Sequence, residues 1–391
     1  MKRCLAIVML FGTAASAHTQ PAVCADAELV RKLSGDIENP DDTLVRSVSD
    51  PAKPGAINER LKQEVDNAPL TMRFKGTTAD ECRAWQKGFT SKLKALLGPH
   101  TPPAKWKTSL ISVKEFDDYR REELLLSAEG HPPLPVYLLL PRPNKGRRAA
   151  ILALHGHGAY GHHPVAGRDD LPGVENAIKN NHYDYGRQLA NQGYIVAVPC
   201  MTPFGDRLGK SAGKSDACAD TFIRMQLLGK TLMAENLRDC LWCVELLARH
   251  EEVDAERIGC VGLSYGGRMT MLTAALEPRI KVAAISGALN VMQERIRKPY
   301  SCGAQIIPGL LQYGDVPEIA SLIAPRACLW EVGTQDKLID PLWADEILLR
   351  QRRAYKALAA EHQLAVDRFE GGHVWHGKAA IILLDKVLRP R

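Results

Sequence analysis

Five short, nearly continuous apolar runs from residue 149 onward restrict the fold of this chain more than any other feature of its sequence. Segments with the spacing of amphipathic helices separate the runs. Strands that are almost wholly apolar are typical of a parallel sheet with helices on both faces. The alternation of such strands with helices predicts an α/β fold with a mostly parallel central sheet. The runs are Ala149–Leu154, Tyr194–Val198, Ile258–Val261, Val282–Ile285 and Ala327–Trp330.

Further strand and helix patterns extend this prediction and divide the chain into two parts. Further strands are expected at Ser109–Val113, Glu123–Ser127 and Val136–Leu140, with turns between them. Helical patterns cover Glu81–Leu97, Tyr185–Asn191, Met269–Leu276 and Trp343–His362, and one long helix is expected within Thr221–His250. We therefore expect a polar helical or irregular accessory segment over residues 18–107 and one α/β domain over residues 108–391, with helices on both faces of its sheet.

Composition excludes several classes of protein. Hydrophobic residues make up 45% and charged residues 25% of the 391, as in globular proteins with a large core and unlike disordered or polytopic membrane proteins. The net charge is +6, and no long Lys/Arg run or basic-aromatic stripe is present. We therefore expect no nucleic-acid partner.

The first 17 residues have the pattern of a secretory signal peptide. Lys2 and Arg3 precede an apolar run, and Ala15-Ser16-Ala17 offers a small-residue cleavage site. The apolar run is too short to span a bilayer, and Cys24 lacks the preceding Leu of a lipoprotein signal. We expect export to the periplasm or beyond without a stable membrane anchor; a buried N-terminal helix is the alternative interpretation.

The ten cysteines fit an exported protein only loosely, since nine remain once the signal segment is removed, and an odd number cannot all pair within the chain. Cys260 and Cys328 lie in apolar strands and are expected in the core. Cys240 and Cys243 have redox spacing but lie in mid-helix, away from the helix N-terminus that would lower a thiol pKa. A bridge between Cys24 and Cys82 stays open.

The segment Gly262-Leu263-Ser264-Tyr265-Gly266 matches G-x-S-x-G and stands between an apolar run and a helical pattern. In that setting the Ser lies on a tight strand-to-helix turn, and the glycines permit strand and helix to approach closely. A serine hydroxyl is a weak nucleophile until a base takes its proton. We therefore interpret Ser264 as a catalytic nucleophile rather than an ordinary turn serine.

Candidates for the acid and the base of a catalytic triad follow Ser264 in the chain. Asp336 comes after the apolar run that ends at Trp330, and His373 comes after a glycine pair that follows an expected strand at Ala365–Phe369. The order Ser264, Asp336, His373 is one of the known chain orders of a Ser-His-Asp triad. The carboxyl ends of parallel strands would present all three side chains on one edge of the sheet.

Each of these two assignments has a neighbouring rival. His376 follows His373 by three residues, but the glycines before His373 favour the tight turn that aims a catalytic ring. Asp340 follows Asp336 by four residues, but Asp340 precedes Pro341 and is expected to cap the next helix. His376 is expected to be a supporting or packing residue.

A triad also needs donors for the oxyanion. The sequence His155-Gly-His-Gly158 directly follows an expected strand, where one backbone N–H is commonly supplied. We nominate the backbone N–H of His157, with Gly158 next, together with that of Tyr265 after the nucleophile. The side chains of His155 and His157 are expected only to support the turn.

Three other histidines, His162, His163 and His182, invite a metal interpretation. We find no carboxylate or Cys at ligand spacing to complete a site, so no metal is expected. The chain has no glycine-rich phosphate cradle or dinucleotide motif, and no cofactor is expected.

These motifs together resemble the α/β-hydrolase superfamily, specifically its dienelactone-hydrolase-like and acetyl-xylan-esterase-like bacterial branch. The resemblance runs from about Val136 to the C-terminus. Ser264 stands where true dienelactone hydrolases use Cys, and Tyr265 where the better-defined acetyl xylan esterases carry Gln, so the resemblance leaves the substrate open. It rests on His155-Gly-His-Gly158, Gly262-Leu-Ser-Tyr-Gly-Gly267, Pro308–Asp315, Ile323-Ala-Pro-Arg326, Gly333-Thr-Gln-Asp336 and Gly371-Gly-His373.

The resemblance implies a serine carboxylic-ester hydrolase that acts through an acyl-enzyme, with a small-molecule or saccharide ester as its partner, preferably of a short acetyl-type acid. A serine peptidase of the prolyl-oligopeptidase type is the alternative, although residues 1–130 are too few and too polar for the propeller that usually gates such enzymes. A non-catalytic binding protein on the same fold is a third interpretation. The oligomeric state is not indicated by the sequence.

Overall fold

The computed structural model describes residues 57–143, 146–209, 217–297 and 302–389. The chain forms two compact units, residues 1–66 and residues 67–391. In the first unit, helix α3 (Ile57–Asp66) is the described element, and it carries exposed ion pairs from Arg60 to Glu64 and from Lys62 to Glu59. The signal segment and the accessory residues before residue 57 lie outside the described residues. The expected boundary at residue 107 stays a prediction.

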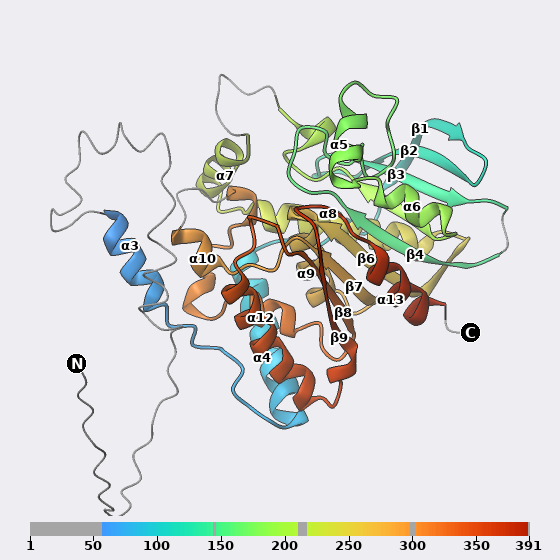
Figure 1. Ribbon diagram of the computed structural model, residues 1–391. Helices are drawn as coiled ribbons and strands as arrows, with labels where there is room; N and C mark the ends of the chain where they lie inside the picture. Colours follow the sequence, from blue (N-terminus) through green and yellow to red (C-terminus); the bar gives the residue numbers. More distant parts are fainter. Residues whose placement is uncertain (1–56, 144–145, 210–216, 298–301, 390–391) are drawn as a thin grey trace, which may run out of the picture. The chain divides into compact units, whose positions relative to one another are not determined.

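A nine-stranded sheet forms the centre of the larger unit (Figure 1). Its strand order is β1-β2-β3-β5-β4-β6-β7-β8-β9. The first three strands pair antiparallel and β3 pairs antiparallel with β5, whereas every pair from β5 to β9 is parallel. The strands are β1 (Lys107–Glu115), β2 (Tyr119–Ser127), β3 (Leu134–Pro141), β4 (Arg148–Leu154), β5 (Ile195–Pro199), β6 (Val253–Leu263), β7 (Ile280–Ser286), β8 (Ala327–Gly333) and β9 (Leu364–Phe369). Every strand that the sequence predicted is present.

Helices cover both faces of this sheet, which confirms the predicted α/β fold with its mostly parallel sheet. The α-helices of this unit are α4 (Ala79–Leu97), α5 (Val174–Asn181), α6 (Tyr185–Asn191), α7 (Ala217–Leu227), α8 (Leu232–Arg249), α9 (Tyr265–Leu276), α10 (Met292–Arg297), α11 (Val316–Ser321), α12 (Pro341–Ala357) and α13 (Lys378–Leu388). Short 3-10 turns are η1 (Gly205–Arg207), η2 (Gly303–Gln305), η3 (Leu310–Gln312) and η4 (Glu361–Gln363). Among the described residues, no helix combines the length and the apolar character needed to span a membrane.

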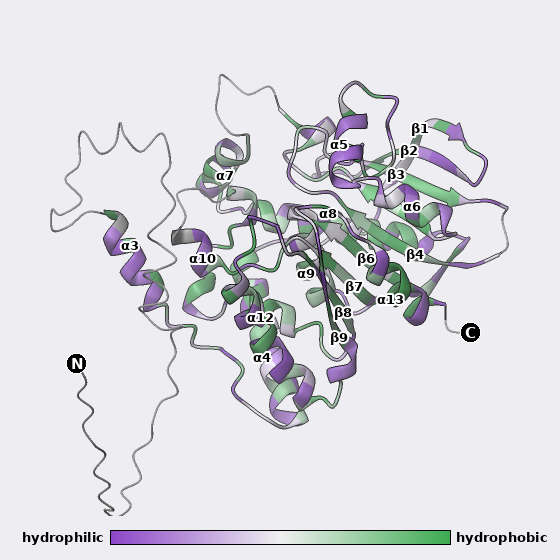
Figure 2. Cartoon of the chain, viewed as in Figure 1, coloured by the Kyte–Doolittle hydropathy of each residue, from purple (hydrophilic) through white to green (hydrophobic). Residues whose placement is uncertain are grey.

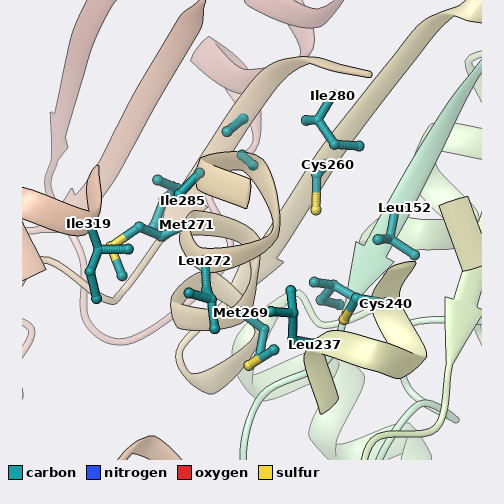
Figure 3. Packing of buried hydrophobic residues seen from close by; sticks show 14 of the residues in the cluster. Leu152, Leu237, Cys240, Cys260, Met269, Met271, Leu272, Ile280, Ile285 and Ile319 are labelled. Atoms are coloured by element: carbon teal, nitrogen blue, oxygen red, sulfur yellow. The ribbon is translucent and has the colours of Figure 1, made fainter. Parts of the chain in front are cut away.

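The core consists of two apolar clusters, one on each face of the sheet. Strand β4 shows why: Leu152 and Leu154 join the cluster beneath α8 and α9, whereas Ile151 and Ala153 join the cluster beneath α6 and α13. Side chains on a strand alternate between faces, so an apolar strand supplies both clusters. Figure 2 shows the central strands coloured as mainly hydrophobic, and Figure 3 shows Leu152 with side chains of α8 and α9 on one face.

Helix α4, predicted as a helical patch, packs into the same core. Its N-terminus has a capping box, in which the Thr78 side chain accepts from the Glu81 N–H and the Glu81 side chain accepts from the Thr78 N–H. Phe89 and Leu93 on its inner face are fully buried among residues of the cluster beneath α8 and α9. This part of the expected accessory segment therefore belongs to the larger compact unit.

The long helix predicted within Thr221–His250 is confirmed as α8, and a separate helix, α7, precedes it. The break falls at Gly229, whose φ of 64° lies in the left-handed region that favours glycine. Thr231 then caps α8, its side chain accepting a hydrogen bond from the Ala234 N–H at 3.1 Å. Both signals stand in the sequence and mark where α8 begins.

The described cysteines are buried. Cys260 and Cys328 lie in β6 and β8, as predicted. Cys240 and Cys243 lie within α8, where burial raises the pKa of both thiols well above the usual range and so opposes redox chemistry. The Cys82 thiol lies 3.7 Å from the carbonyl oxygen of Ala354, and its suggested partner in a bridge, Cys24, lies outside the described residues.

Candidate active site

The nucleophile candidate Ser264 lies at the turn between β6 and α9. Its backbone has φ 63° and ψ −120°, a strained conformation for a residue with a side chain. The turn is tight, because a Cβ added to Gly266 would overlap the carbonyl oxygen of Leu154, and one added to Gly262 would lie 2.7 Å from that same oxygen. The two glycines therefore permit the strained turn that presents a serine at the edge of the sheet.

Asp336 and His373 meet at the same sheet edge, beyond the ends of β8 and β9. The Nδ1 atom of His373 lies 2.7 Å from Oδ2 of Asp336. The other carboxylate oxygen, Oδ1, accepts the N–H of Leu338 at 2.9 Å, so the loop orients the acid. A carboxylate only accepts, so Nδ1 carries the ring proton that it donates to Asp336. The Nε2 atom of His373 is buried and has no hydrogen-bond partner among the described residues, which leaves it able to take a proton.

The loop after β7 joins the histidine to the nucleophile. The Ser264 N–H donates to the carbonyl oxygen of Ser286 at 2.8 Å, and the next residue, Gly287, packs against the His373 ring. A Cβ at Gly287 would lie 2.8 Å from Cε1 of His373, so the ring fits there because residue 287 is glycine. The Ser264 hydroxyl and the His373 ring form no hydrogen bond in the structure, and catalytic hydrogen bonds of this kind often tighten only when substrate binds.

The loop after β4 lies directly against the nucleophile. A Cβ at Gly156 would be 3.1 Å from Cβ of Ser264 and 2.9 Å from the carbonyl oxygen of Leu263. The Gly156 N–H donates to the Tyr183 hydroxyl at 2.6 Å, so that amide is already used. The next residue along this loop is His157, whose backbone N–H stays the predicted oxyanion donor.

The buried His155 ring holds this loop in place through two hydrogen bonds. Burial lowers its pKa to about 4, so the ring is neutral at physiological pH. Its Nε2 accepts the Met201 N–H at 2.9 Å, which leaves the proton on Nδ1 to donate to the carbonyl oxygen of Gly156 at 2.8 Å. The ring therefore fixes the loop between β5 and η1 against the loop that approaches Ser264.

Tyr265, the second nominated oxyanion donor, is the first residue of α9, and N–H groups in the first turn of a helix have no acceptor within that helix. Its side chain points into the core, where the hydroxyl accepts a hydrogen bond from Asn236 Nδ2 at 2.7 Å. The side chain is therefore structural, and the backbone N–H remains the group that can face a substrate.

Both rivals of the triad assignment have other partners. The Nδ1 atom of His376 lies 2.6 Å from Oδ2 of Asp367, and its ring stacks on Phe369 with centroids 4.4 Å apart. Asp340 caps α12, where its side chain accepts the N–H of Leu342 at 3.0 Å. Neither contacts the Asp336–His373 pair by a hydrogen bond.

Two comparisons with known proteins identify the family of this chain. The model of the dienelactone hydrolase family matches residues 169–301. The chain is also 30% identical over 288 residues to “Putative hydrolase YtaP” of Bacillus subtilis (strain 168), a match that covers 72% of this chain and 92% of the relative.

The chain belongs to the dienelactone hydrolase family. Two solved structures from bacterial esterases extend the comparison of the α/β-hydrolase fold. A “putative acetyl xylan esterase” from Bacteroides fragilis NCTC 9343 has a TM-score of 0.70 at 17% identity and covers 82% of this chain and 84% of its own. A glucuronoyl esterase from Solibacter usitatus has a TM-score of 0.57 at 15% identity, and the match covers 78% of this chain and 93% of the esterase. This member of the dienelactone hydrolase family is therefore a hydrolase with an α/β-hydrolase fold.

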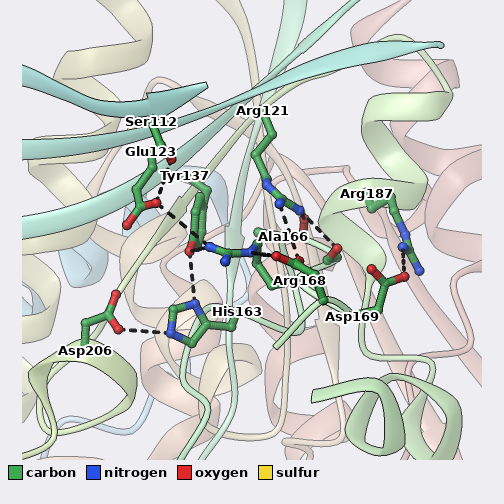
Figure 4. Close-up of polar contacts among 12 residues, drawn as sticks. Ser112, Arg121, Glu123, Tyr137, His163, Ala166, Arg168, Asp169, Arg187 and Asp206 are labelled. Carbon is green, nitrogen blue, oxygen red and sulfur yellow. Dashed lines mark hydrogen bonds and ion pairs between the residues drawn. The ribbon is translucent and has the colours of Figure 1, made fainter. Parts of the chain in front are cut away.

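One statement about metal ligands has to be corrected for this dienelactone hydrolase family member. The sequence offered no carboxylate at ligand spacing for His162 and His163, yet the structure brings Asp206 to both. Nε2 of His163 lies 3.0 Å from Oδ1 of Asp206, and Nδ1 of His163 lies 3.1 Å from the Tyr137 hydroxyl (Figure 4). Spacing failed here because Asp206 lies in η1, which only the fold brings to this loop. His182 is elsewhere, with Nδ1 at 3.3 Å from the carbonyl oxygen of Trp375.

The sequence analysis also missed a buried carboxyl group behind the triad. Glu331 lies in β8, and its Oε1 accepts the Gly377 N–H at 3.0 Å. Burial, and next the neighbouring Asp367, raise its pKa to about 7. The carbonyl oxygen of Glu331 accepts the N–H of Gly287, the residue that packs against His373. A Glu inside an apolar strand is the signal that could have revealed it.

The sequence analysis also missed a cluster of two cysteines and one histidine. Cys218 and Cys302 lie beside the side chain of His157, although they come from α7 and from the residue before η2. Hydrogen bonding to Cys218, and secondarily to His157, lowers the pKa of the Cys302 thiol to about 5 against the opposing effect of burial. No spacing rule connects these three positions, because the fold alone brings them together.

A cavity of about 290 Å³ lies away from this chemistry, at the amino ends of β4 and β5. Arginines contribute much of its lining. The candidate active site is at the opposite, carboxyl edge of the sheet. The lining residues are Arg147, Arg148, Ala149, Gln192, Gly193, Arg257 and Arg389.

Proposed function

We propose that this dienelactone hydrolase family member is a serine carboxylic-ester hydrolase that works through Ser264, His373 and Asp336. The observation that carries the proposal is the 2.7 Å bond between Nδ1 of His373 and Oδ2 of Asp336, on the same sheet edge as a strained Ser264. A base oriented by a buried acid, with its second nitrogen unpartnered among the described residues, is the arrangement that activates a serine.

The mechanism follows from the roles of these groups. The Ser264 hydroxyl attacks the ester carbonyl while Nε2 of His373 takes its proton, and Asp336 stabilises the imidazolium. The backbone N–H groups of His157 and Tyr265 hold the tetrahedral oxyanion. His373 then gives its proton to the leaving alcohol, and an acyl-enzyme remains on Ser264. Water, activated by the same histidine, attacks the acyl carbon and releases the acid.

The proposed substrates are short-chain, acetyl-type esters of carbohydrates or other small molecules. The names of the two structural neighbours, an acetyl xylan esterase and a glucuronoyl esterase, support an ester of a saccharide. The site needs no cofactor or metal for this mechanism. Export by the signal segment over residues 1–17 would bring the enzyme to such extracellular substrates.

The test compares the wild-type protein with Ser264→Ala on p-nitrophenyl acetate, butyrate and octanoate. We expect hydrolysis by the wild type that is fastest on acetate, and no hydrolysis above background by the variant. Equal activity in both proteins would refute the nucleophile assignment. Cleavage of peptides but not of short esters would instead support the serine peptidase, and binding of a saccharide without turnover would support the non-catalytic interpretation.

A further inference from the structure

Two buried thiols and the imidazole of the oxyanion loop converge beside the proposed catalytic site. Cys218 is the second residue of α7, Cys302 directly precedes η2, and His157 lies on the loop after β4. Their sulfur and ring nitrogen atoms all lie within 4.8 Å of one another. The cysteines are 2% and 5% exposed, so the sulfurs face one another rather than solvent.

Tight packing holds this cluster in place. A Cβ at Gly303 would lie 2.6 Å from Cβ of Phe222 and 3.2 Å from the carbonyl oxygen of Cys218, so η2 lies against α7 at a distance that only glycine permits. The His157 ring packs edge-on against Phe204, with centroids 5.3 Å apart. The convergence of the three groups is therefore a product of the packed fold.

The donor set is one that zinc prefers. Cys sulfur and His nitrogen bind Zn²⁺ tetrahedrally, at about 2.3 Å and 2.0 Å, which places neighbouring ligand atoms roughly 3.5–3.8 Å apart. The 4.8 Å limit on the present separations leaves only a small closing movement. Thiolate ligands select zinc over magnesium or calcium, which prefer oxygen.

Two other clusters of ligand-type residues occur within the described ranges, and each contains a close histidine–carboxylate pair. In the first, His163 uses both ring nitrogens, one with Asp206 and one with Tyr137. In the second, His376 pairs with Asp367 at 2.6 Å. Both are built from nitrogen and oxygen only, so the sulfur-containing cluster is the one suited to a soft metal.

We propose that His157, Cys218 and Cys302 bind one Zn²⁺ ion and leave a fourth coordination position open to water. Three protein ligands with an open position are a recurring zinc arrangement in proteins. The ion would tie α7 and η2 to the loop that carries the His157 N–H, and so would fix the position of that oxyanion donor. The side chain of His157 and its backbone would then serve two different sites.

The test measures metal content directly, so its outcome does not depend on the proposed esterase activity. The full chain is stripped with a chelator, incubated with Zn²⁺, desalted and analysed by elemental mass spectrometry. We expect about one zinc per chain in the wild type, and loss of that zinc in Cys218→Ser and in Cys302→Ser. Cys328→Ser, at a buried cysteine of β8 outside the cluster, is the matched control and should keep its zinc. Substitution with Co²⁺ should give thiolate-to-metal charge-transfer absorption that both cluster variants lose.

Three outcomes would overturn the proposal. The first is zinc content that is unchanged in both cysteine variants, and the second is zinc lost in Asp206→Asn or Asp367→Asn instead. The third is a Cys218–Cys302 disulfide in the purified protein, found by peptide mass mapping, with no zinc bound after its reduction. His157→Ala, at an exposed side chain, provides the same metal measurement if a cysteine variant fails to fold.

Discussion

His373 and Asp336 share a 2.7 Å hydrogen bond across 37 positions of sequence, and the bond fixes which ring nitrogen of His373 can act as a base. Because Nδ1 donates to the carboxylate, Nε2 is the atom left to take the serine proton. The acid is held in turn by the Leu338 N–H, so the loop after β8 fixes the orientation of the whole pair. The following predictions start from this relationship.

Replacing the acid should disable the base without disturbing the fold. In Asp336→Asn the amide can donate to the ring, which moves the ring proton to Nε2 and blocks proton uptake from Ser264. We expect kcat on p-nitrophenyl acetate to fall by about 10³–10⁴, with little change in KM. Asp340→Asn, at the cap of α12, is the control and should stay within about threefold of wild type with little change in stability, because Asn caps a helix about as well as Asp. An Asp336→Asn enzyme within tenfold of wild type would exclude Asp336 as the acid.

Alanine substitutions at the neighbouring His373 and His376 should have very different effects on kcat. His373→Ala removes the proposed base and should reduce kcat by at least about 10³. His376→Ala removes the partner of Asp367 and the ring that stacks on Phe369, so its kcat should remain within about tenfold of wild type, although its melting temperature should fall. The reverse result, activity that survives His373→Ala but vanishes in His376→Ala, would exchange their roles.

The close approach of the β4 loop to the nucleophile predicts a severe effect of one methyl group. In Gly156→Ala the added carbon would lie 3.1 Å from Cβ of Ser264 and would overlap the Tyr183 hydroxyl, so the loop must move. Displacement of an oxyanion donor should reduce kcat by about 10²–10³. At Gly209 an added Cβ meets nothing within 4 Å, so Gly209→Ala should behave like wild type in the same assay. Wild-type turnover by Gly156→Ala would contradict this account of the loop.

The buried carboxyl of Glu331 should make stability depend on pH. Its pKa is about 7 in the folded protein and near 4.5 when exposed, so the folded state holds the proton more tightly. The resulting stabilisation is complete below about pH 4.5 and disappears as the pH rises through 7, by up to about 3 kcal/mol. Glu331→Gln lacks this titration. We therefore expect the melting temperature of the variant, relative to wild type, to rise between pH 5 and pH 8. The exposed Glu129→Gln should follow wild type, and a constant difference for Glu331→Gln would refute the assignment.

The sequence predicted the fold well because the apolar runs and the helical patterns between them both indicated the same α/β fold. Apolar runs such as Ala149–Leu154 must be strands when helical patterns alternate with them, and the triad candidates followed from their places after such strands. The long helix predicted within Thr221–His250 shows the limit of periodicity, since its apolar stripe marks α8 but did not reveal α7 on the other side of Gly229. Helix α11, with six residues, carried too few turns for a periodic pattern to show.

The supporting groups of the site were beyond prediction for a different reason. The Tyr183 hydroxyl accepts a hydrogen bond from the Gly156 N–H, and the Asp206 carboxylate pairs with the His163 ring. Both contacts form only because separate loops pack together. Cys218 and Cys302 likewise meet only because η2 lies against α7. Motifs report residues whose spacing is set by one turn or one strand end, whereas these contacts depend on the arrangement of several elements.

The central claim is that Ser264 is the covalent nucleophile, and active-site labelling tests it most directly. A fluorophosphonate probe is added to wild type and to Ser264→Ala, and the adduct is located by peptide mass spectrometry. The account predicts a single adduct on Ser264 in the wild type, none in Ser264→Ala, and much slower labelling in His373→Ala. Equal labelling of Ser264→Ala, or an adduct on another residue with Ser264 unmodified, would contradict it.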